Sequence, residues 1–206
     1  MEGWKIWRGI RRHAHRPGGP GGVRRANRWR ALVVATLCAA NAAQAQLETA
    51  TSTIVAVSRQ MGVAVQGNFT KFGAQIDFDP AKPTGGTARI VVETGSYDLG
   101  DSTYDESVRG ADWFDSKAFP QATFTSTAIV PTAPNQYRVD GKLTIKGHTE
   151  AVSVPVVLTR QGAMQTFDGT LPVQRQVFNI GTGQWKDTSV VADEVLIKFH
   201  IVVAHK

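Results

Sequence analysis

Several segments of the chain alternate between apolar and polar residues with a period of two. In residues 137–145 the odd positions are apolar or small and the even positions are polar or charged, and residues 195–201 repeat the pattern near the C-terminus. Successive side chains of a β-strand point to opposite faces, so this alternation predicts strands with one buried face. Weaker versions of the pattern predict further strands at 54–58, 63–69, 75–78, 88–93, 122–129, 152–158 and 167–173.

Residues that favour turns separate these predicted strands. Proline and glycine mark the longer loops, and the short run 146–149 joins two strong strands closely enough for a hairpin. Residues 102–118 lack the alternation, and they are expected to form one or two helical turns. Ser102 or Asp105 is expected to cap them, because the side-chain oxygen of such residues accepts hydrogen bonds from free backbone N–H groups.

Many short strands with one apolar face must close into a sandwich or a barrel. We predict an all-β fold, an antiparallel barrel of about eight strands with a short helical segment near residues 102–118. A barrel of this size either fills with side chains or holds one small ligand. The expected inward positions include the small residues Ala56, Ala88, Ala122 and Gly141, which we interpret as leaving room for a ligand.

The first 45 residues differ in composition from the rest. Four arginines between positions 24 and 30 precede an apolar run at 31–43, and Ala43-Gln44-Ala45 supplies the small residues that a signal peptidase requires. We therefore expect residues 1–45 to be a signal peptide cleaved near Ala45, leaving one domain at 46–206 in the periplasm. An uncleaved membrane anchor is the alternative. The apolar run is shorter than the roughly 20 residues that span a bilayer, so no stable membrane insertion is expected after cleavage.

Loss of this leader changes the charge of the protein. The whole chain carries a formal charge of +6, whereas residues 46–206 hold 14 basic and 16 acidic side chains, a net charge of −2. No basic run remains, which argues against nucleic acid as a partner. The only cysteine, Cys38, lies in the leader, so the exported domain must be held together by its core alone.

The predicted strands carry no recognisable catalytic or metal-binding constellation. His148, His200 and His205 lie at a hairpin turn, at an outward strand position and at the chain end, so their spacing gives no reason to converge on a metal ion. No nucleophile motif links serine, histidine and aspartate residues. We expect no metal, no cofactor and no enzymatic activity.

Four stretches occur together in an order typical of one protein family. They are 61–72, which contains Gly67-Asn68-Phe69; 108–126, which contains Asp112-Trp113-Phe114-Asp115; 137–147, which contains Leu143-Thr144-Ile145-Lys146-Gly147; and 169–181, which contains Phe178-Asn179-Ile180-Gly181. The chain resembles the YceI-like family, whose members are secreted lipocalin-like barrels associated with polyisoprenoid binding. Ala56, Gln60 and Gln176 depart from the family's pattern, which favours a larger apolar residue, a histidine and an aspartate at these positions.

The resemblance implies a lipocalin-like barrel that holds a long isoprenoid chain, such as the tail of a carrier lipid or a quinone. Such a ligand needs apolar contacts and few polar ones, because each buried methylene contributes about 0.8 kcal/mol. The alternative role of any inward apolar side chain is ordinary core packing. The ligand-contact candidates are Ile54, Ala56, Ile90, Val92, Trp113, Phe114, Phe124, Leu143, Ile145, Val154, Val156, Phe178, Ile197 and Phe199.

Arg109 and Arg175 are candidates for contact with a polar head group such as a phosphate or a quinone oxygen. The alternative is a structural salt bridge, for Arg109 with Asp105 or Asp112. We interpret the chain as a periplasmic carrier of an isoprenoid or similar amphiphilic lipid, and a homodimer stays open. Two other hypotheses remain. A filled barrel would act through its surface as an interaction or stress-related module and expose an apolar patch; an enzyme would bury a titratable group beside a partner.

Overall fold

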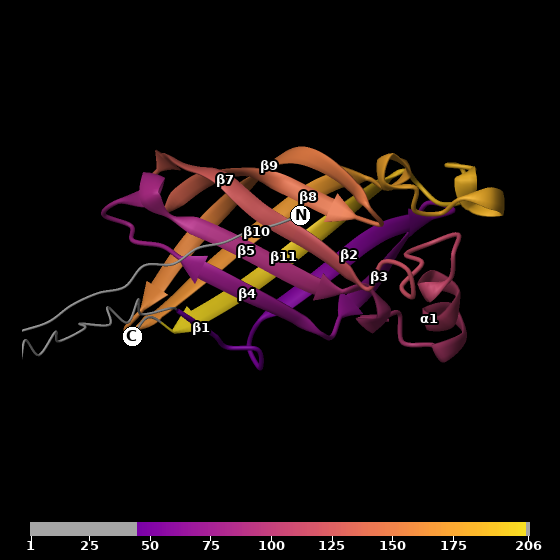
Figure 1. Cartoon of the computed structure of the whole chain (residues 1–206), viewed down its shortest axis with the longest axis horizontal. Helices are drawn as coiled ribbons and strands as arrows, with labels where there is room; N and C mark the ends of the chain where they lie inside the picture. Colours follow the sequence, from indigo (N-terminus) through magenta and orange to yellow (C-terminus); the bar gives the residue numbers. More distant parts are fainter. Residues whose placement is uncertain (1–44, 205–206) are drawn as a thin grey trace, which may run out of the picture. The chain divides into compact units, whose positions relative to one another are not determined.

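The computed structural model describes residues 45–204 (Figure 1). The expected signal peptide therefore lies outside the described residues, apart from Ala45. The strands are β1 (Gln46–Leu47), β2 (Thr53–Gln60), β3 (Val63–Phe69), β4 (Phe72–Asp77), β5 (Thr87–Glu93), β6 (Tyr97–Asp98), β7 (Gln121–Ala133), β8 (Gln136–Ile145), β9 (His148–Gln161), β10 (Met164–Gln174) and β11 (Glu194–Ala204). The helix is α1 (Ser102–Arg109), and the 3₁₀ turns are η1 (Pro83–Gly85), η2 (Thr94–Ser96), η3 (Arg175–Phe178) and η4 (Gly183–Lys186).

The strands form one antiparallel sheet that curls around a common interior. Neighbouring strands follow the order β4-β5-β7-β8-β9-β10-β11-β2-β3-β6. The short strand β1 pairs with β11 and also contacts β4, so the edge strand β4 returns toward the far side of the sheet. Figure 1 shows the strands wrapped around this interior, with α1 at one end of the barrel. This arrangement confirms the predicted all-β, antiparallel fold of lipocalin-like type.

The sheet contains the nine strand segments predicted from alternation and two more, against an expected barrel of about eight strands. Nine strands have at least six residues, and they coincide with the nine segments predicted from alternation. The two additional strands, β1 and β6, have two residues each. A two-residue strand is too short to show a period of two, so the sequence pattern did not reveal them.

The β8–β9 hairpin has the close connection that the sequence indicates. Lys146 and Gly147 link the paired residues Ile145 and His148, with φ values of 47° and 78°. Positive φ at both central residues is the type I′ geometry, whose twist matches that of the paired strands. The turn is shorter than the predicted run 146–149, because β9 already begins at His148.

Only the first half of the predicted helical segment 102–118 is α-helical. Helix α1 ends at Arg109, and turns follow it. The capping residue is Asp101, whose side chain accepts hydrogen bonds from the first free N–H groups of the helix. The prediction of Ser102 or Asp105 is therefore wrong, because the helix begins one residue earlier than a cap at Ser102 would allow and Asp105 lies inside it.

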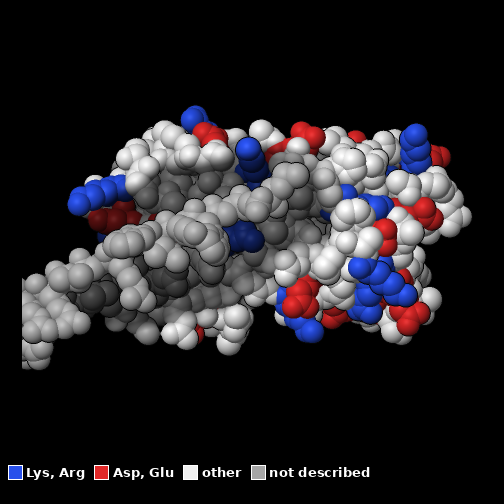
Figure 2. Space-filling view, viewed as in Figure 1, with Lys and Arg blue, Asp and Glu red and all other residues white. Residues whose placement is uncertain are grey.

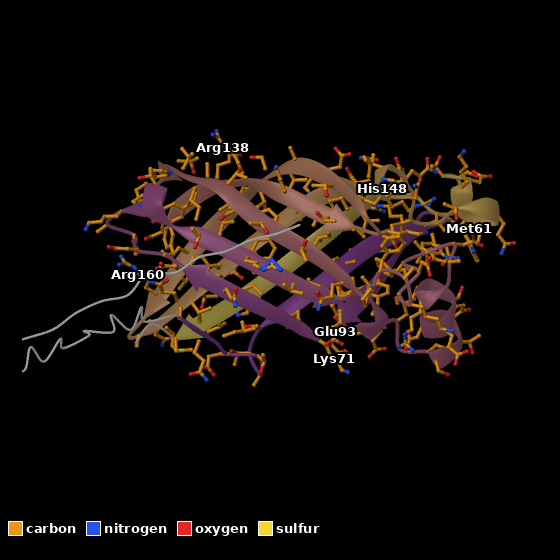
Figure 3. All side chains as sticks on the ribbon, viewed as in Figure 1. Met61, Lys71, Glu93, Arg138, His148 and Arg160 are labelled. Atoms are coloured by element: carbon orange, nitrogen blue, oxygen red, sulfur yellow. The ribbon has the colours of Figure 1, made fainter. Side chains whose placement is uncertain are left out.

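The outer face of the sheet carries most of the charged side chains, although Val63 on β3 and Val157 on β9 are exposed. Figure 3 shows Arg138 and Arg160 projecting from the strands and Lys71 beside Glu93, whose charged groups lie 3.8 Å apart. On the face shown in Figure 2, basic and acidic side chains are interspersed over the described residues. Within residues 45–204 no helix is long and apolar enough to cross a membrane. The largely polar outer face leaves the inner face of the sheet as the place where the apolar side chains gather.

Candidate functional site

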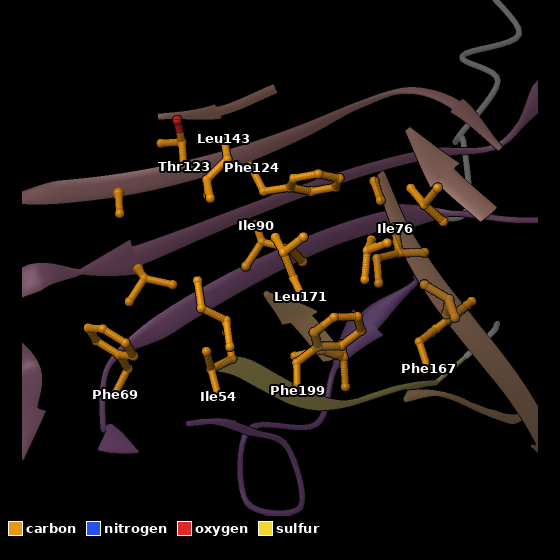
Figure 4. Close-up of a pocket in the computed structure, with 18 of the residues that line it drawn as sticks. Ile54, Phe69, Ile76, Ile90, Thr123, Phe124, Leu143, Phe167, Leu171 and Phe199 are labelled. Atoms are coloured by element: carbon orange, nitrogen blue, oxygen red, sulfur yellow. The ribbon is translucent and has the colours of Figure 1, made fainter. Parts of the chain in front are cut away.

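The inward faces of the strands enclose an apolar cavity with a volume of about 160 Å³. None of the described residues in its wall is charged, and only Thr123 and Tyr137 bear a polar side-chain atom. The oxygen of Thr123 points away from the other labelled side chains in Figure 4. The wall is formed by Ile54, Phe69, Ile76, Phe78, Ala88, Ile90, Val92, Phe114, Ala122, Thr123, Phe124, Ile129, Tyr137, Val139, Leu143, Ile145, Val154, Val156, Phe167, Leu171, Ile197, Phe199 and Ile201.

The two ends of the cavity differ in packing. At one end the ring of Phe78 packs edge-on against Tyr137 and Phe167, with centroid separations of 5.0 and 5.7 Å, and all three side chains are buried. Toward α1, the lining residues Val92 and Phe114 are only partly buried. Aromatic rings therefore close one end of the cavity, whereas the lining toward α1 is less tightly packed.

Polar contacts join three segments at the α1 end of the barrel. Lys146, in the β8–β9 turn, donates hydrogen bonds from Nζ to the carbonyl oxygens of Ala111 and Asn179, at 2.7 and 2.9 Å. The backbone N–H of Gly181 donates to the carbonyl oxygen of Asp112 at 2.8 Å. The segment after α1, the β8–β9 turn and the loop after β10 are thereby connected as one cap over this end.

Eleven of the fourteen predicted ligand-contact residues line the cavity. They come from six strands and from the segment after α1, and the period of two accounts for the inward direction of those on strands. Their convergence on one wall follows from the curl of the sheet. The eleven are Ile54, Ile90, Val92, Phe114, Phe124, Leu143, Ile145, Val154, Val156, Ile197 and Phe199.

The other three predicted residues, Ala56, Trp113 and Phe178, are not in the cavity wall. Ala56 packs with Tyr97 in a second, smaller core cluster. Trp113 lies in the cap, with its ring centroid 5.5 Å from that of Trp185. Phe178 is buried within the main core. For these three residues the structure matches the alternative roles, core packing and anchoring of the irregular segments.

Neither of the two arginine candidates reaches the cavity wall. Arg175 is only 3% exposed, and each of its five N–H groups donates to a backbone carbonyl oxygen. No donor remains for a head group, so Arg175 is a structural residue of the loop after β10. Arg109 pairs with Asp105 at 3.9 Å on the surface of α1, one of the two salt bridges considered. The acceptors of Arg175 are the carbonyls of Ile180, Gly181, Trp185, Val191 and Ala192.

Twelve residues of the wall were not among the candidates. Extending the period of two along each strand would have found several of them, since Tyr137 and Val139 continue the inward row of Leu143 and Ile145. Others come from strands whose alternation is weak, or from strand ends. The twelve are Phe69, Ile76, Phe78, Ala88, Ala122, Thr123, Ile129, Tyr137, Val139, Phe167, Leu171 and Ile201.

The small inward residues do not all leave free space. Ala88 and Ala122 line the cavity. Gly141 does not leave room as expected, because the ring of Phe124 occupies the space where its side chain would be. A small residue on one strand thus makes room for a large neighbour as well as for a ligand.

Tyr97 offers a pH-dependent test of the packing beside the cavity. Burial raises the pKa of its hydroxyl from 10.0 to about 12. Below pH 10 both the folded and the unfolded states keep the proton, whereas between pH 10 and about 12 only the unfolded state releases it, so the free energy of unfolding falls. The two pKa units correspond to about 2–3 kcal/mol.

We expect denaturant titrations between pH 10 and about 12 to show that the free energy of unfolding falls more in the wild-type protein than in Tyr97→Phe, by about 2–3 kcal/mol. The substitution itself removes only a long contact, 3.5 Å from the hydroxyl to the carbonyl oxygen of Ala56. Equal losses in the two proteins would contradict the burial of the hydroxyl.

The described residues place little reactive chemistry at the cavity. Among residues 45–204, no group of three or more His, Cys, Asp or Glu side chains is arranged to hold a metal ion. His148 and His200 lie outside the cavity wall, in contact with Asn179 at 2.8 Å and Asp168 at 2.6 Å. The wall instead provides an apolar surface against which a hydrocarbon group can be buried.

The fold is shared with known proteins. The YceI-like domain profile matches residues 46–203. A UPF0312 protein of Vibrio cholerae is 32% identical over 127 residues, which cover 60% of this chain and 67% of the relative. The crystal structure of BcnA from Burkholderia cenocepacia superposes with a TM-score of 0.75 at 56% identity, covering 76% of this chain and 99% of BcnA. A polyisoprenoid binding domain from Saccharophagus degradans has a TM-score of 0.65 at 15% identity, covering 80% of this chain and 99% of that domain. The chain belongs to the YceI-like family.

Proposed function

We propose that residues 46–206 form a periplasmic protein that binds and carries an isoprenoid or similar amphiphilic lipid. The observation that carries the proposal is the cavity of about 160 Å³, whose described wall is hydrocarbon with no charged side chain. Apolar cavities stay dry and accept apolar ligands. A polar head group finds no partner in such a wall, so the tail lies inside and the head group stays at the entrance.

The size of the cavity sets how much of a tail it accepts. An engineered cavity of about 150 Å³ holds benzene, so this cavity accepts a ring or an isoprene unit with its side chains in place. A longer tail requires the partly buried lining residues to move apart. One five-carbon unit gives roughly 3–4 kcal/mol of gross stabilisation, from about 0.8 kcal/mol per buried methylene. A few units offset the cost of association and leave binding in the micromolar range or tighter.

Three further observations support the proposal. Polyisoprenoid binding is the property named for the Saccharophagus degradans domain, which shares the fold. The leader at 1–45 has the arginine-rich start, the apolar run and the small residues of a secretory signal, which favours the periplasm. The absence of acidic, basic and histidine side chains from the described cavity wall favours a binding role over catalysis.

Lipid extraction tests this function directly. We expect organic extracts of the protein, purified from the periplasm, to contain an isoprenoid lipid by mass spectrometry. The delipidated protein should then bind a polyprenyl alcohol with a dissociation constant of about 1 μM or lower. A five-carbon isoprenyl phosphate is the control ligand, and it should bind far more weakly because most of the affinity comes from the tail. Absence of both extracted lipid and polyprenol binding would refute the proposal.

The proposed periplasmic location has a separate test. The protein recovered from the periplasmic fraction should begin at Gln46 when its N-terminus is sequenced, because cleavage is expected after Ala45. Recovery of the uncleaved chain from the membrane fraction would support the anchor alternative.

A further inference from the structure

Each of two long strands has a single glycine in its inward row. On β8 the inward row is Tyr137, Val139, Gly141, Leu143 and Ile145, and every member except the glycine is a large buried side chain in the cavity wall. On β10 the row is Gln165, Phe167, Gly169, Leu171 and Val173, and all of these except the glycine are buried. Gly141 and Gly169 both have negative φ, a conformation that any residue adopts, so the backbone does not require glycine here. The presence of glycine at these two positions therefore has another cause.

The reason is the close approach of an aromatic ring from the neighbouring strand. A Cβ atom on Gly141 would lie 2.5 Å from both Cε2 and Cζ of Phe124 on β7. A Cβ atom on Gly169 would lie 2.3 Å from Cζ and 2.9 Å from Cε1 of Phe199 on β11. Carbon atoms in contact are normally about 3.5–4.0 Å apart. The outer edge of each ring therefore occupies the space that a side chain would take, and the ring lies against the wall.

The two rings face each other across the barrel. In the sheet order β7 and β11 are separated by β8, β9 and β10, which places them on opposite sides of a curled sheet of nine long strands. Figure 4 shows Phe124 and Phe199 on opposite sides of the cavity, with Ile90 and Leu171 between them in the view. Both rings line the cavity and both are only partly buried. We name the pairs Gly141–Phe124 and Gly169–Phe199 the ring seats.

The seats control the free space. A ring that lost its seat would have to turn away from the wall and into the cavity. The volume of about 160 Å³ is close to that of a cavity that holds one benzene molecule, so one displaced phenyl ring would fill most of it. The cavity is open because both rings are held against the wall.

We propose that the two ring seats determine which tails the cavity accepts: they hold Phe124 and Phe199 apart, and the space between the rings selects unsaturated or flat hydrocarbon over saturated chains. This inference rests on the proposed function. Two aromatic rings in contact gain about 0.5–1.5 kcal/mol beyond the area they bury. We extend this to other planar π systems, double bonds included, whereas a saturated chain has no π system to offer. Isoprene units and quinone rings both have that character, whereas saturated acyl chains lack it.

A third glycine supplies a matched control. A Cβ atom on Gly67 would lie 2.3 Å from Cζ of Tyr97, so this pair has the same construction. Tyr97, however, belongs to the smaller core cluster and does not itself line the cavity; it packs behind the lining rings of Phe69 and Phe114, at 4.8 and 5.6 Å between centroids. Substitution of Gly67 therefore reproduces the clash with a neighbouring ring, without the backbone contact found at 141 and 169, and it leaves Phe124 and Phe199 on their glycines.

The test compares two alcohols with the same carbon skeleton, geranylgeraniol and its fully saturated counterpart. The wild-type protein should prefer the unsaturated alcohol by about fivefold, which corresponds to the middle of the range for aromatic pairs. Phe124→Leu and Phe199→Leu should still bind both alcohols but lose this preference. Gly141→Ala and Gly169→Ala should weaken both by about tenfold or more, as expected when the apolar contacts of one isoprene unit are blocked. Gly67→Ala should stay within about twofold of wild type for both alcohols.

A double variant separates the ring from the backbone. The ring is not the only neighbour: a Cβ atom at 141 would also meet the carbonyl oxygen of Thr125 at 2.7 Å, and one at 169 that of Pro155 at 2.8 Å. Some loss of stability is therefore expected in both alanine variants whatever the ring does. If the ring is what closes the cavity, Gly169→Ala combined with Phe199→Leu should regain the affinity of Phe199→Leu alone. The leucine variants keep Gly141 and Gly169 and replace each ring with another large apolar side chain. They therefore test the proposal even if the alanine variants fail to fold.

Several outcomes would overturn the inference. Unchanged affinities in both glycine variants, or a retained preference in both leucine variants, would refute the seats while leaving the proposed function intact. If the wild-type protein binds neither alcohol, the proposed function fails together with the tail preference. In that case the binding of benzene tests the ring seats separately from the proposed function. Benzene should occupy the cavity in crystals of the wild-type protein and of Gly67→Ala but not of Gly169→Ala. Benzene in all three would refute the seats as well.

Discussion

Replacing Arg175 with methionine is expected to lower the free energy of unfolding by about 3–5 kcal/mol, the cost typical of breaking a buried charged network. The side chain is 3% exposed, and its five N–H groups donate to carbonyl oxygens between 2.7 and 3.0 Å away. Methionine fills a similar volume but donates nothing, so these carbonyl groups lose their partners. The loop 175–193 would then lose the contacts that hold it in shape.

Arg175→Lys tests whether the shape of the guanidinium matters or only its charge. Lysine keeps the positive charge but has three donors at one nitrogen, and these cannot match acceptors spread around a planar fork. We expect it to lose at least about 2 kcal/mol, since several carbonyls stay unpaired. Arg109→Met is the matched control. Its ion pair with Asp105 is 3.9 Å long and the arginine is 42% exposed, so a change within about 0.5 kcal/mol is expected.

Denaturant titrations of the four proteins measure these differences, provided that the slopes of the transitions are the same. Hydrogen exchange adds a local measurement, because the amides of Trp185 to Ala192 should exchange faster in the Arg175 variants. A loss below about 1 kcal/mol in Arg175→Met would contradict the structural role and return the arginine to consideration as a ligand contact.

The fold was predictable because its long strands follow one strict rule. Rows such as Tyr137 to Ile145 alternate without interruption, and a strand with one buried face permits no other arrangement. The rule fails where an element is short or irregular. β1 and β6 have two residues each, and α1 begins and ends at positions that several polar residues could have capped equally well.

The cavity wall was predictable to the same degree and for the same reason. Residues such as Leu143 and Phe199 point inward because of their position on a strand, whatever the partner strands are. Trp113 and Phe178 lie on segments without a period, so nothing in the sequence fixed their direction. The role of Arg175 depends on carbonyl groups 5 to 17 residues away that the loop brings together, and no sequence pattern records such contacts.

The ring seats depend on contacts between neighbouring strands, which the pattern along a single strand does not show. Read along β8, Gly141 looks like a gap in the inward row. Its meaning appears only when β7 is placed beside β8 and the ring of Phe124 covers it. The sequence reveals the row, whereas the register between neighbouring strands reveals what fills its gap.

Filling the cavity from its wall should abolish binding of the tail. Ala88 on β5 lines the cavity, and its N–H donates to Oγ of Ser126 at 2.8 Å, so its backbone is held in place. In Ala88→Phe the added ring occupies a space of about 160 Å³, close to the volume that takes benzene. We expect affinity for a polyprenyl alcohol to fall by about a hundredfold or more, equivalent to about 2.7 kcal/mol.

The variant should nevertheless fold. Strain from overpacking, typically about 1–3 kcal/mol, is offset by the apolar area that the new ring buries in an empty cavity. Ala151→Phe makes the same chemical change at an exposed, outward position of β9, so it should bind the alcohol as the wild-type protein does. Calorimetric titration measures the affinities, and denaturant unfolding confirms that both variants are folded. If folded Ala88→Phe still binds at wild-type strength, the tail does not occupy this cavity, because the two cannot share a space large enough for only one ring.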